Sequence, residues 1–180
     1  MIDEHIGIAP SGLHADARIL IDYAREQAQT YRLLFDEPAE VEYVTKKISD
    51  LKQVYTQHGG VRPFGGAALI VGGGVDSHGP MLFQTDPGGI YFGYYATALG
   101  GNSSSAILDY LEKNYTYDMD IGECTKLAVK ALSLVVESLE VDRIEMGGTI
   151  ETATKKYRKL NTDEIKALID KIKEERGSTQ

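Results

Sequence analysis

Apolar residues recur every three or four positions in two segments near the start of the chain, the spacing of one buried helical face. In the first segment these positions are Leu13, Ala17, Leu20, Ala24, Ala28 and Tyr31. The second segment begins near Pro38, which suits the first turn of a helix, and its apolar positions are Val41, Val44, Ile48, Leu51 and Tyr55. A strand-like run at 6–9 precedes both and is closed by Pro10, Ser11 and Gly12. The pattern predicts one strand followed by two amphipathic helices.

The pattern changes in the middle of the chain. Three strand-like runs, at 67–71, 81–85 and 90–98, are separated by short glycine-rich turns. A parallel crossover needs about a dozen residues, so turns this short predict antiparallel neighbours.

The rest of the chain, from about residue 102, predicts further helices and a hairpin. One helix follows N-cap residues at 102–104. Another follows Asp120 and Glu123, which have the spacing of a capping box, and its apolar positions continue to Leu139. Segments 143–151 and 155–160 predict a hairpin, and a last amphipathic helix is expected after Thr162.

Helices therefore occur in pairs and strands in runs, which is the pattern of an α+β protein rather than of βαβ alternation. The order suits a layered sandwich with helices outside and antiparallel sheets within. The chain has 180 residues and shows no linker, low-complexity tract or internal repeat. We expect a single domain over residues 1–180.

Composition narrows the classes of partner and compartment. The net charge of -8 argues against a nucleic-acid groove. The one basic cluster, at 155–159, is interpreted as a solvated strand edge. No stretch approaches the roughly 18 apolar residues of a membrane span, and the first ten residues do not read as a signal peptide. One cysteine, Cys124, allows no internal disulfide. These features predict a cytoplasmic protein without nucleic-acid or membrane partners.

The sequence offers no catalytic constellation by itself. Gly72 to Gly74 follow a strand but precede another strand, so they are interpreted as a hairpin loop and not a phosphate site. Cys124 is expected in the first turn of a helix without a nearby His or Asn, and the four histidines have no metal-ligand spacing. Asp16 and Asp22 are interpreted as caps or turn formers. We expect no metal and no cofactor.

The segment Arg62-Pro63-Phe64 stands at the entrance to a buried strand. The X-Pro step favours extended backbone at Arg62, and Phe64 is expected to enter the core. Arg62 could hold a carboxylate or helix-end carbonyls through two hydrogen bonds, or the segment could be a simple structural hinge. Both readings stay open from the residues alone.

The string YTQHGGVRPFGGAALIVGG closely resembles the segment typical of proteasome α-type subunits. The residues in the family's positions are Tyr55, Gln57, Gly60, Val61, Arg62, Pro63, Phe64 and Gly65. Segments 11–18, 74–89 and 95–101 resemble the family's first long helix, its central hairpin and the strand with a glycine turn before the third helix. The resemblance covers nearly the whole chain and is closest in character to archaeal α subunits.

This resemblance implies an Ntn-hydrolase-like αββα sandwich with antiparallel sheets. It also implies a non-catalytic subunit of the 20S core particle, whose seven-membered α rings cap catalytic β-type rings and control substrate entry for ATP-dependent protein degradation. Gly12 and Leu13 match one flank of the pocket that receives an activator's C-terminal tail. The alternative is a β-type or other Ntn-hydrolase threonine peptidase whose nucleophile lay in a preceding segment.

Against the family pattern the chain is expected to be N-terminally truncated, since it opens at Ile2-Asp3 in what resembles a middle strand. The family's gating tail, ring-top helix and first strands would then be missing. The pocket lysine that pairs with the activator's terminal carboxylate would be missing too. The resemblance implies other α subunits, β-type catalytic subunits and a regulatory ATPase as partners.

Overall fold

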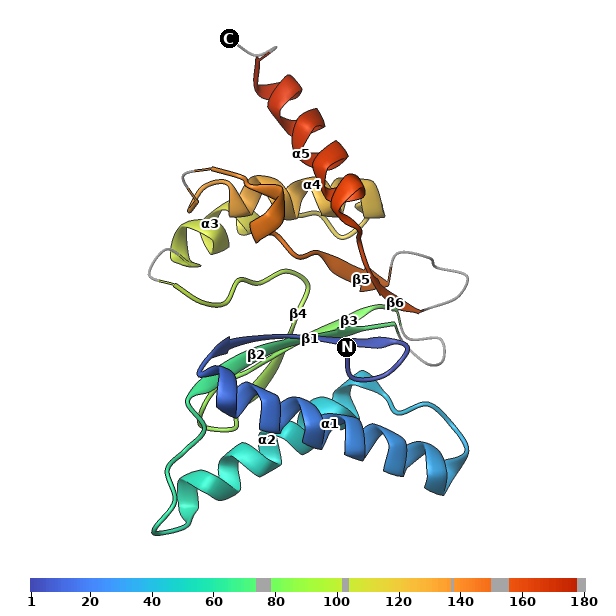
Figure 1. Cartoon of the computed structure of the whole chain (residues 1–180), viewed down its shortest axis with the longest axis vertical. Coiled ribbons are helices and arrows are strands. Elements are labelled where there is room, and N and C mark those ends of the chain that lie inside the picture. Colours follow the sequence, from blue (N-terminus) through green and yellow to red (C-terminus); the bar gives the residue numbers. More distant parts are fainter. Residues whose placement is uncertain (74–78, 102–103, 137, 150–155, 178–180) are drawn as a thin grey trace. The chain divides into compact units, whose positions relative to one another are not determined.

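The computed structural model describes residues 1–73, 79–101, 104–136, 138–149 and 156–177 (Figure 1). Two compact units account for them. The first contains residues 1–95 and 148–157, and the second contains 96–147 together with the segment from 158 onward. Each unit is described by itself below, and a single domain over 1–180 stays a prediction.

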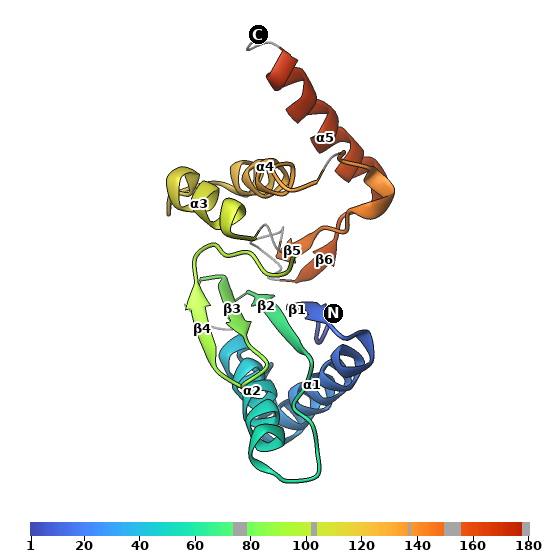
Figure 2. The same ribbon diagram turned by 90° about the vertical axis from the view of Figure 1, so that its left-hand side faces the viewer.

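The first unit is built on a four-stranded sheet in the order β1 (Ile6–Gly12), β2 (Gly66–Gly72), β3 (Met81–Thr85) and β4 (Tyr91–Tyr94). All three pairings are antiparallel, as predicted from the short turns. Helices α1 (His14–Phe35) and α2 (Val41–Gln57) lie side by side against one face of this sheet (Figure 1, Figure 2). The strand and the two helices predicted at the start of the chain are thus confirmed.

Three predicted boundaries in this unit are wrong. Strand β1 does not end before Pro10 but continues to Gly12, opposite Gly66. It is an edge strand of the four-stranded sheet, where a proline, which has no backbone N–H to donate, is tolerated. Helix α2 begins at Val41 after Glu40 and not near Pro38. Strand β4 ends at Tyr94, well before the predicted position 98.

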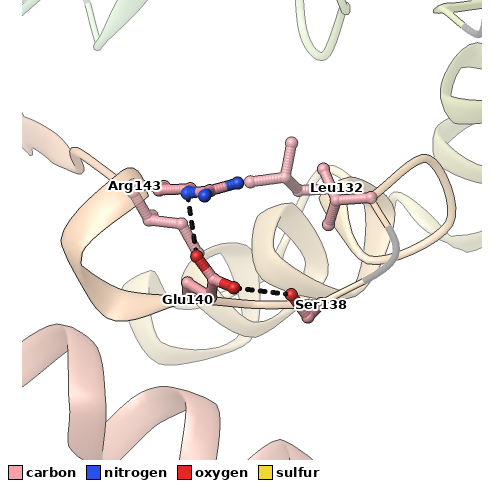
Figure 3. Close-up of a pocket in the computed structure, with 6 residues that line it drawn as sticks. Leu132, Ser138, Glu140 and Arg143 are labelled. Atoms are coloured by element: carbon pink, nitrogen blue, oxygen red, sulfur yellow. Dashed lines mark hydrogen bonds and ion pairs between the residues drawn. The ribbon is translucent and has the colours of Figure 1, made fainter.

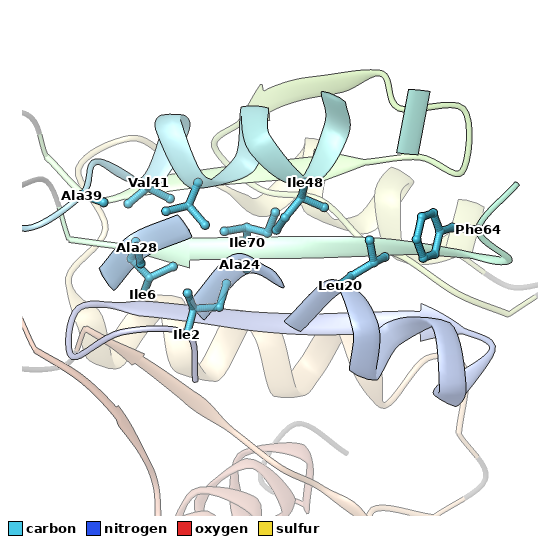
Figure 4. Close-up of a cluster of buried hydrophobic side chains, with 11 residues drawn as sticks. Ile2, Ile6, Leu20, Ala24, Ala28, Ala39, Val41, Ile48, Phe64 and Ile70 are labelled. Carbon is cyan, nitrogen blue, oxygen red and sulfur yellow. The ribbon is translucent and has the colours of Figure 1, made fainter. Parts of the chain in front are cut away.

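The core of the first unit lies between the sheet and the two helices. Figure 4 shows its buried side chains: Ile2, Ile6, Leu20, Ala24, Ala28, Ala39, Val41, Val44, Ile48, Phe64 and Ile70. Two of the buried residues of α1, Ala24 and Ala28, have small side chains. Along β2, Ala68, Ile70 and Gly72 are buried while Leu69 and Val71 are only partly covered, the period-two alternation of a sheet. The helical stripes found in the sequence are therefore the ones that form this core.

The second unit contains α3 (Ser104–Asn114), α4 (Ile121–Leu132), the short 3-10 helix η1 (Val141–Arg143) and α5 (Thr162–Gly177). The predicted capping box is confirmed, because Glu123 N donates to Asp120 Oδ1 at 2.8 Å and Asp120 N donates to Glu123 Oε2 at 3.0 Å. Helix α4 ends at Leu132, seven residues before the end of the predicted apolar stripe. A small core joins α4 to α5 through Val129, Ile165, Ile169 and Ile172.

Strands β5 (Gly147–Thr149) and β6 (Tyr157–Lys159) form a two-stranded sheet, which corresponds to the predicted last hairpin. The loop between them, the predicted glycine-rich turn at 74–78 and the N-cap residues 102 and 103 lie outside the described residues. Helices and antiparallel strands segregate along the chain, so the α+β class is confirmed. Among the residues described, no helix is long and apolar enough to cross a membrane.

Truncating Ile70 should test the packing of the first unit. Ile70 is fully buried in β2, so Ile70→Ala is expected to lower the free energy of unfolding by about 2–5 kcal/mol, because it removes apolar contacts and leaves a cavity. Urea unfolding followed by circular dichroism measures this. Leu33→Ala is the matched control, since Leu33 is 86% exposed and its loss should change stability by less than about 0.5 kcal/mol. Equal effects of the two substitutions would contradict the core assignment.

Candidate functional site

Two segments singled out in the sequence lie together in the first unit: the β1–α1 turn at Gly12 and Leu13, and the segment Val61–Gly65. The register of β1 and β2 places Gly12 opposite Gly66. Leu13 N donates a hydrogen bond to Gly65 O at 2.9 Å. The β1–α1 turn and the family motif are therefore in direct backbone contact.

Asp16 joins the two segments. Its carboxylate accepts from Arg62 Nη1 at 2.6 Å, Arg62 Nη2 at 2.7 Å and Gly65 N at 2.7 Å. We call these three residues the Asp16 clamp. The Asp16 side chain is only 5% exposed, and it lies in the first turn of α1, where the helix dipole favours a negative charge. The interpretation of Asp16 as an ordinary cap or turn former is wrong, since its partners lie in a distant segment.

The clamp shifts the acidity of both ionised groups. The hydrogen bonds from Arg62, and then that from Gly65, lower the pKa of Asp16 from its ordinary 3.8 to about 2. The same bond to Asp16 raises the pKa of Arg62. Both groups are thus charged over the whole physiological range, and the contact is a permanent bidentate ion pair.

The Arg62 guanidinium is bound by Asp16, while most of the side chain is exposed to solvent. Its Nη1 also donates to Pro63 O at 3.0 Å, while 64% of the side chain is exposed. Of the two readings that the sequence left open, the structure shows the carboxylate contact, and it shows that this contact is also what fixes the hinge.

Close approach of the two segments demands glycine at position 12. Gly12 has φ +122°, a conformation that L side chains rarely adopt, and a Cβ there would overlap Gly65 O. A Cβ at Gly65 would lie 2.6 Å from Leu13 Cδ1, the end of an exposed side chain that can rotate away. The two backbones approach this closely because position 12 carries no side chain.

The other motif residues divide between core and surface. The rings of Tyr55 and Phe64 lie 4.6 Å apart, and Phe64 is buried, as the sequence predicted. Val61 and Leu13 are exposed by 48% and 53%, and Gln57, Gly60 and Pro63 are exposed as well. The motif therefore stabilises the fold through one set of side chains and presents another set to solvent.

Neither the clamp nor its surroundings resemble a reaction centre. Each oxygen of the Asp16 carboxylate already accepts a hydrogen bond, and the clamp contains no nucleophile.

Cys124, on α4, is not activated either. Burial, and then the nearby acidic groups of the α4 cap, raise the pKa of the Cys124 thiol, the opposite of what an activated cysteine needs. In the described ranges no group of three or more His, Cys, Asp or Glu is placed to hold a metal ion.

A separate pocket of about 440 Å³ lies in the second unit (Figure 3). Leu132, Val136 and Ile144 provide its apolar lining. On its polar side, Glu140 pairs with Arg143 Nε at 2.8 Å and accepts from Ser138 Oγ at 3.2 Å. The Glu140 carboxylate is thus shared between Arg143 and Ser138, and the described residues that line the pocket include no histidine, lysine or cysteine.

The basic cluster at 155–159 is also neutralised where it is described. Lys156 pairs with Glu4, Arg158 with Glu164 and Lys159 with Glu145. Lys155 lies outside the described residues. The cluster therefore makes surface ion pairs, and no continuous positive surface follows from it.

Breaking the clamp should affect stability. Arg62→Ala would leave the buried Asp16 carboxylate without its guanidinium, so the urea midpoint should fall. The urea midpoint of Arg62→Lys, which keeps the charge but not the two parallel hydrogen bonds, should fall by less than that of Arg62→Ala. Arg18→Ala, an exposed arginine on α1, is the control and should stay close to the unsubstituted chain. A midpoint unchanged by Arg62→Ala would show that the ion pair contributes nothing.

The acidity of Asp16 gives the stabilisation a defined pH dependence. The folded-state pKa of about 2 lies below the ordinary 3.8, so the contribution is present above pH 3.8 and is lost as the pH falls toward 2. The stability difference between the unsubstituted chain and Asp16→Asn should therefore shrink over this window. Thermal unfolding from pH 6 to pH 2 measures it, and a difference independent of pH would contradict the assignment.

Comparisons with known proteins agree with the resemblance seen in the sequence. The family described as "Proteasome subunit" matches residues 1–148, a range that includes the whole clamp. A protein named proteasome subunit alpha from Pyrobaculum aerophilum is 53% identical over 173 residues, which cover 96% of this chain and 69% of that protein.

Two further relatives carry the same name. The Sulfolobus acidocaldarius protein is 48% identical, with 96% of this chain and 71% of the relative covered. The Methanothermobacter thermautotrophicus protein is also 48% identical, with 95% and 68% covered. These matches confirm the predicted α+β fold of the Ntn-hydrolase-like type. The chain therefore belongs to the proteasome subunit family, in which its relatives are the α-type subunits.

Proposed function

We propose that this chain is a non-catalytic α-ring subunit of the 20S proteasome core particle. It would act as part of the scaffold of the barrel and control the entry of substrates for ATP-dependent protein degradation. The observation that carries the proposal is the identity of 53% to a protein named proteasome subunit alpha, over nearly the whole chain.

The geometry of the motif supports this role. The residues by which the family is recognised form an ion pair, a close glycine contact and an aromatic core contact. None of these is a reactive arrangement. A protein whose characteristic residues fix a backbone acts on its partners through the surfaces that this backbone presents.

Assembly with other proteasome subunits in a ring follows from the family. The particular partners are part of the proposal: further α subunits in the same ring and β-type catalytic subunits in a neighbouring ring. The proposed location is the cytoplasm, and neither nucleic acid nor a membrane is involved.

We further propose that Gly12 and Leu13 form one flank of a pocket for an activator's tail. The exposure of Leu13 at a turn fixed by the Asp16 clamp supports this, and a regulatory ATPase is the partner in question.

Assembly and activity together test the proposal. The purified chain, alone and mixed with an archaeal β-type subunit, should elute in size-exclusion chromatography as rings or half-rings whose mass is measured by light scattering. The chain alone should not hydrolyse fluorogenic peptides. A strictly monomeric species under conditions where another archaeal α subunit assembles would contradict the ring role, and peptide turnover by the chain alone would favour the threonine peptidase alternative.

A further inference from the structure

Lys52 is fully buried in the first unit. It lies on α2 among the residues that face the sheet, and its exposed fraction is 0%. A lysine ammonium has three N–H donors, whereas among the described residues Lys52 Nζ donates to Thr85 O, at the long distance of 3.5 Å. An ammonium is costly to hold in such a place, because burial removes its contact with bulk solvent and no short hydrogen bond compensates.

Polar groups of two elements meet around this amine. Ser49 Oγ and Thr85 Oγ1 are hydrogen-bonded at 2.9 Å, and both residues are buried. The Ser49 and Thr85 hydroxyls are therefore hydrogen-bonded to each other rather than to the Lys52 amine. Among the described residues, Asp86, next to Thr85, attracts the Lys52 ammonium, and Asp86 Oδ1 accepts a hydrogen bond from Ile90 N at 2.8 Å.

The turn between β3 and β4, residues 86–89, covers this cluster. Gly89 has φ +86°, and a Cβ built on it would lie 2.5 Å from Ser49 O and 2.7 Å from Gln53 N. The turn backbone is thus packed directly on α2, against Ser49, about one helical turn before Lys52, and against Gln53, the residue after it. Pro87 and Gly88 are exposed, so lifting the turn is the short way to bring water to the amine.

We propose that Lys52 makes the packing of the 86–89 turn on α2 dependent on pH, with the neutral amine holding the turn closed and the ammonium favouring its opening. This goes beyond the proposed function and does not rest on it. Burial lowers the pKa of Lys52 from 10.5 to about 8, and attraction by Asp86 offsets only part of this. Since the amine regains its ordinary pKa once hydrated, opening takes up a proton between pH 8 and 10.5. Opening and unfolding therefore become less favourable as the pH rises through this window.

Titration of the intact chain tests the proposal directly. With lysine labelled with ¹³C at Cε, NMR should show one resonance that titrates near pH 8 and disappears in Lys52→Met. The amide signals of Gly89 and Ile90 should shift with the same midpoint. A Lys52 midpoint near 10.5, or turn amides that do not follow the Lys52 titration, would overturn it.

Stability measurements provide the second test. Lys52→Met keeps an unbranched side chain but removes the charge, so at pH 7 it should be more stable than the unsubstituted chain in urea. That advantage should disappear by pH 10.5, a change on the order of 100-fold in the relative folding equilibrium constant. Lys113→Met removes an exposed lysine on α3 and should follow the unsubstituted chain at every pH.

Lys52→Gln repeats the experiment with a neutral polar side chain, should the methionine variant fold poorly. An advantage of the neutral variants that persists unchanged to pH 10.5, or no advantage of either variant at pH 7, would contradict the proposal.

Discussion

The Asp16 carboxylate holds together the end of β1 and the start of β2. It accepts hydrogen bonds from Nη1 and Nη2 of Arg62 and from the backbone N–H of Gly65. Arg62 and Gly65 are 46 and 49 positions further along the chain than Asp16. One helix-initiating residue thereby fixes the start of β2. The Gly12–Gly66 pairing of β1 and β2, the Leu13 backbone bond to Gly65 and the buried Phe64 all lie beside this contact. A buried carboxylate is normally a liability, and here three donors at short distance compensate for its lost hydration.

This arrangement explains why an arginine and a proline stand side by side where a buried strand begins. Pro63 keeps the backbone extended so that Arg62 turns back to α1 while Phe64 continues into the core beside Tyr55. The polar and apolar residues of the motif thus point in different directions from one rigid segment. The exposed remainder, including Val61 and Leu13, is what a neighbouring protein can contact.

Local patterns predicted most of the elements, and long-range contacts account for what they missed. The helical stripes, the antiparallel turns and the Asp120–Glu123 capping box are periodic or short-range signals, and each could be recognised in the sequence. Asp16 could not, because an aspartate in a first helical turn reads as an ordinary cap until its distant partner is known. Strand β1 was expected to stop at Pro10, since the pairing that carries it to Gly12 depends on β2. Lys52 gave no signal at all, because a lysine beside an apolar stripe is expected to reach solvent.

The contact between Gly12 and Gly65 limits which residues evolution can place at the β1–α1 turn. Gly12 has φ +122°, and a Cβ there would overlap Gly65 O, a backbone atom that no rotamer change moves aside. Position 12 should therefore stay glycine among related chains, whereas Leu13, which is 53% exposed, can change. The outward surface of the turn can thus vary over a backbone that cannot.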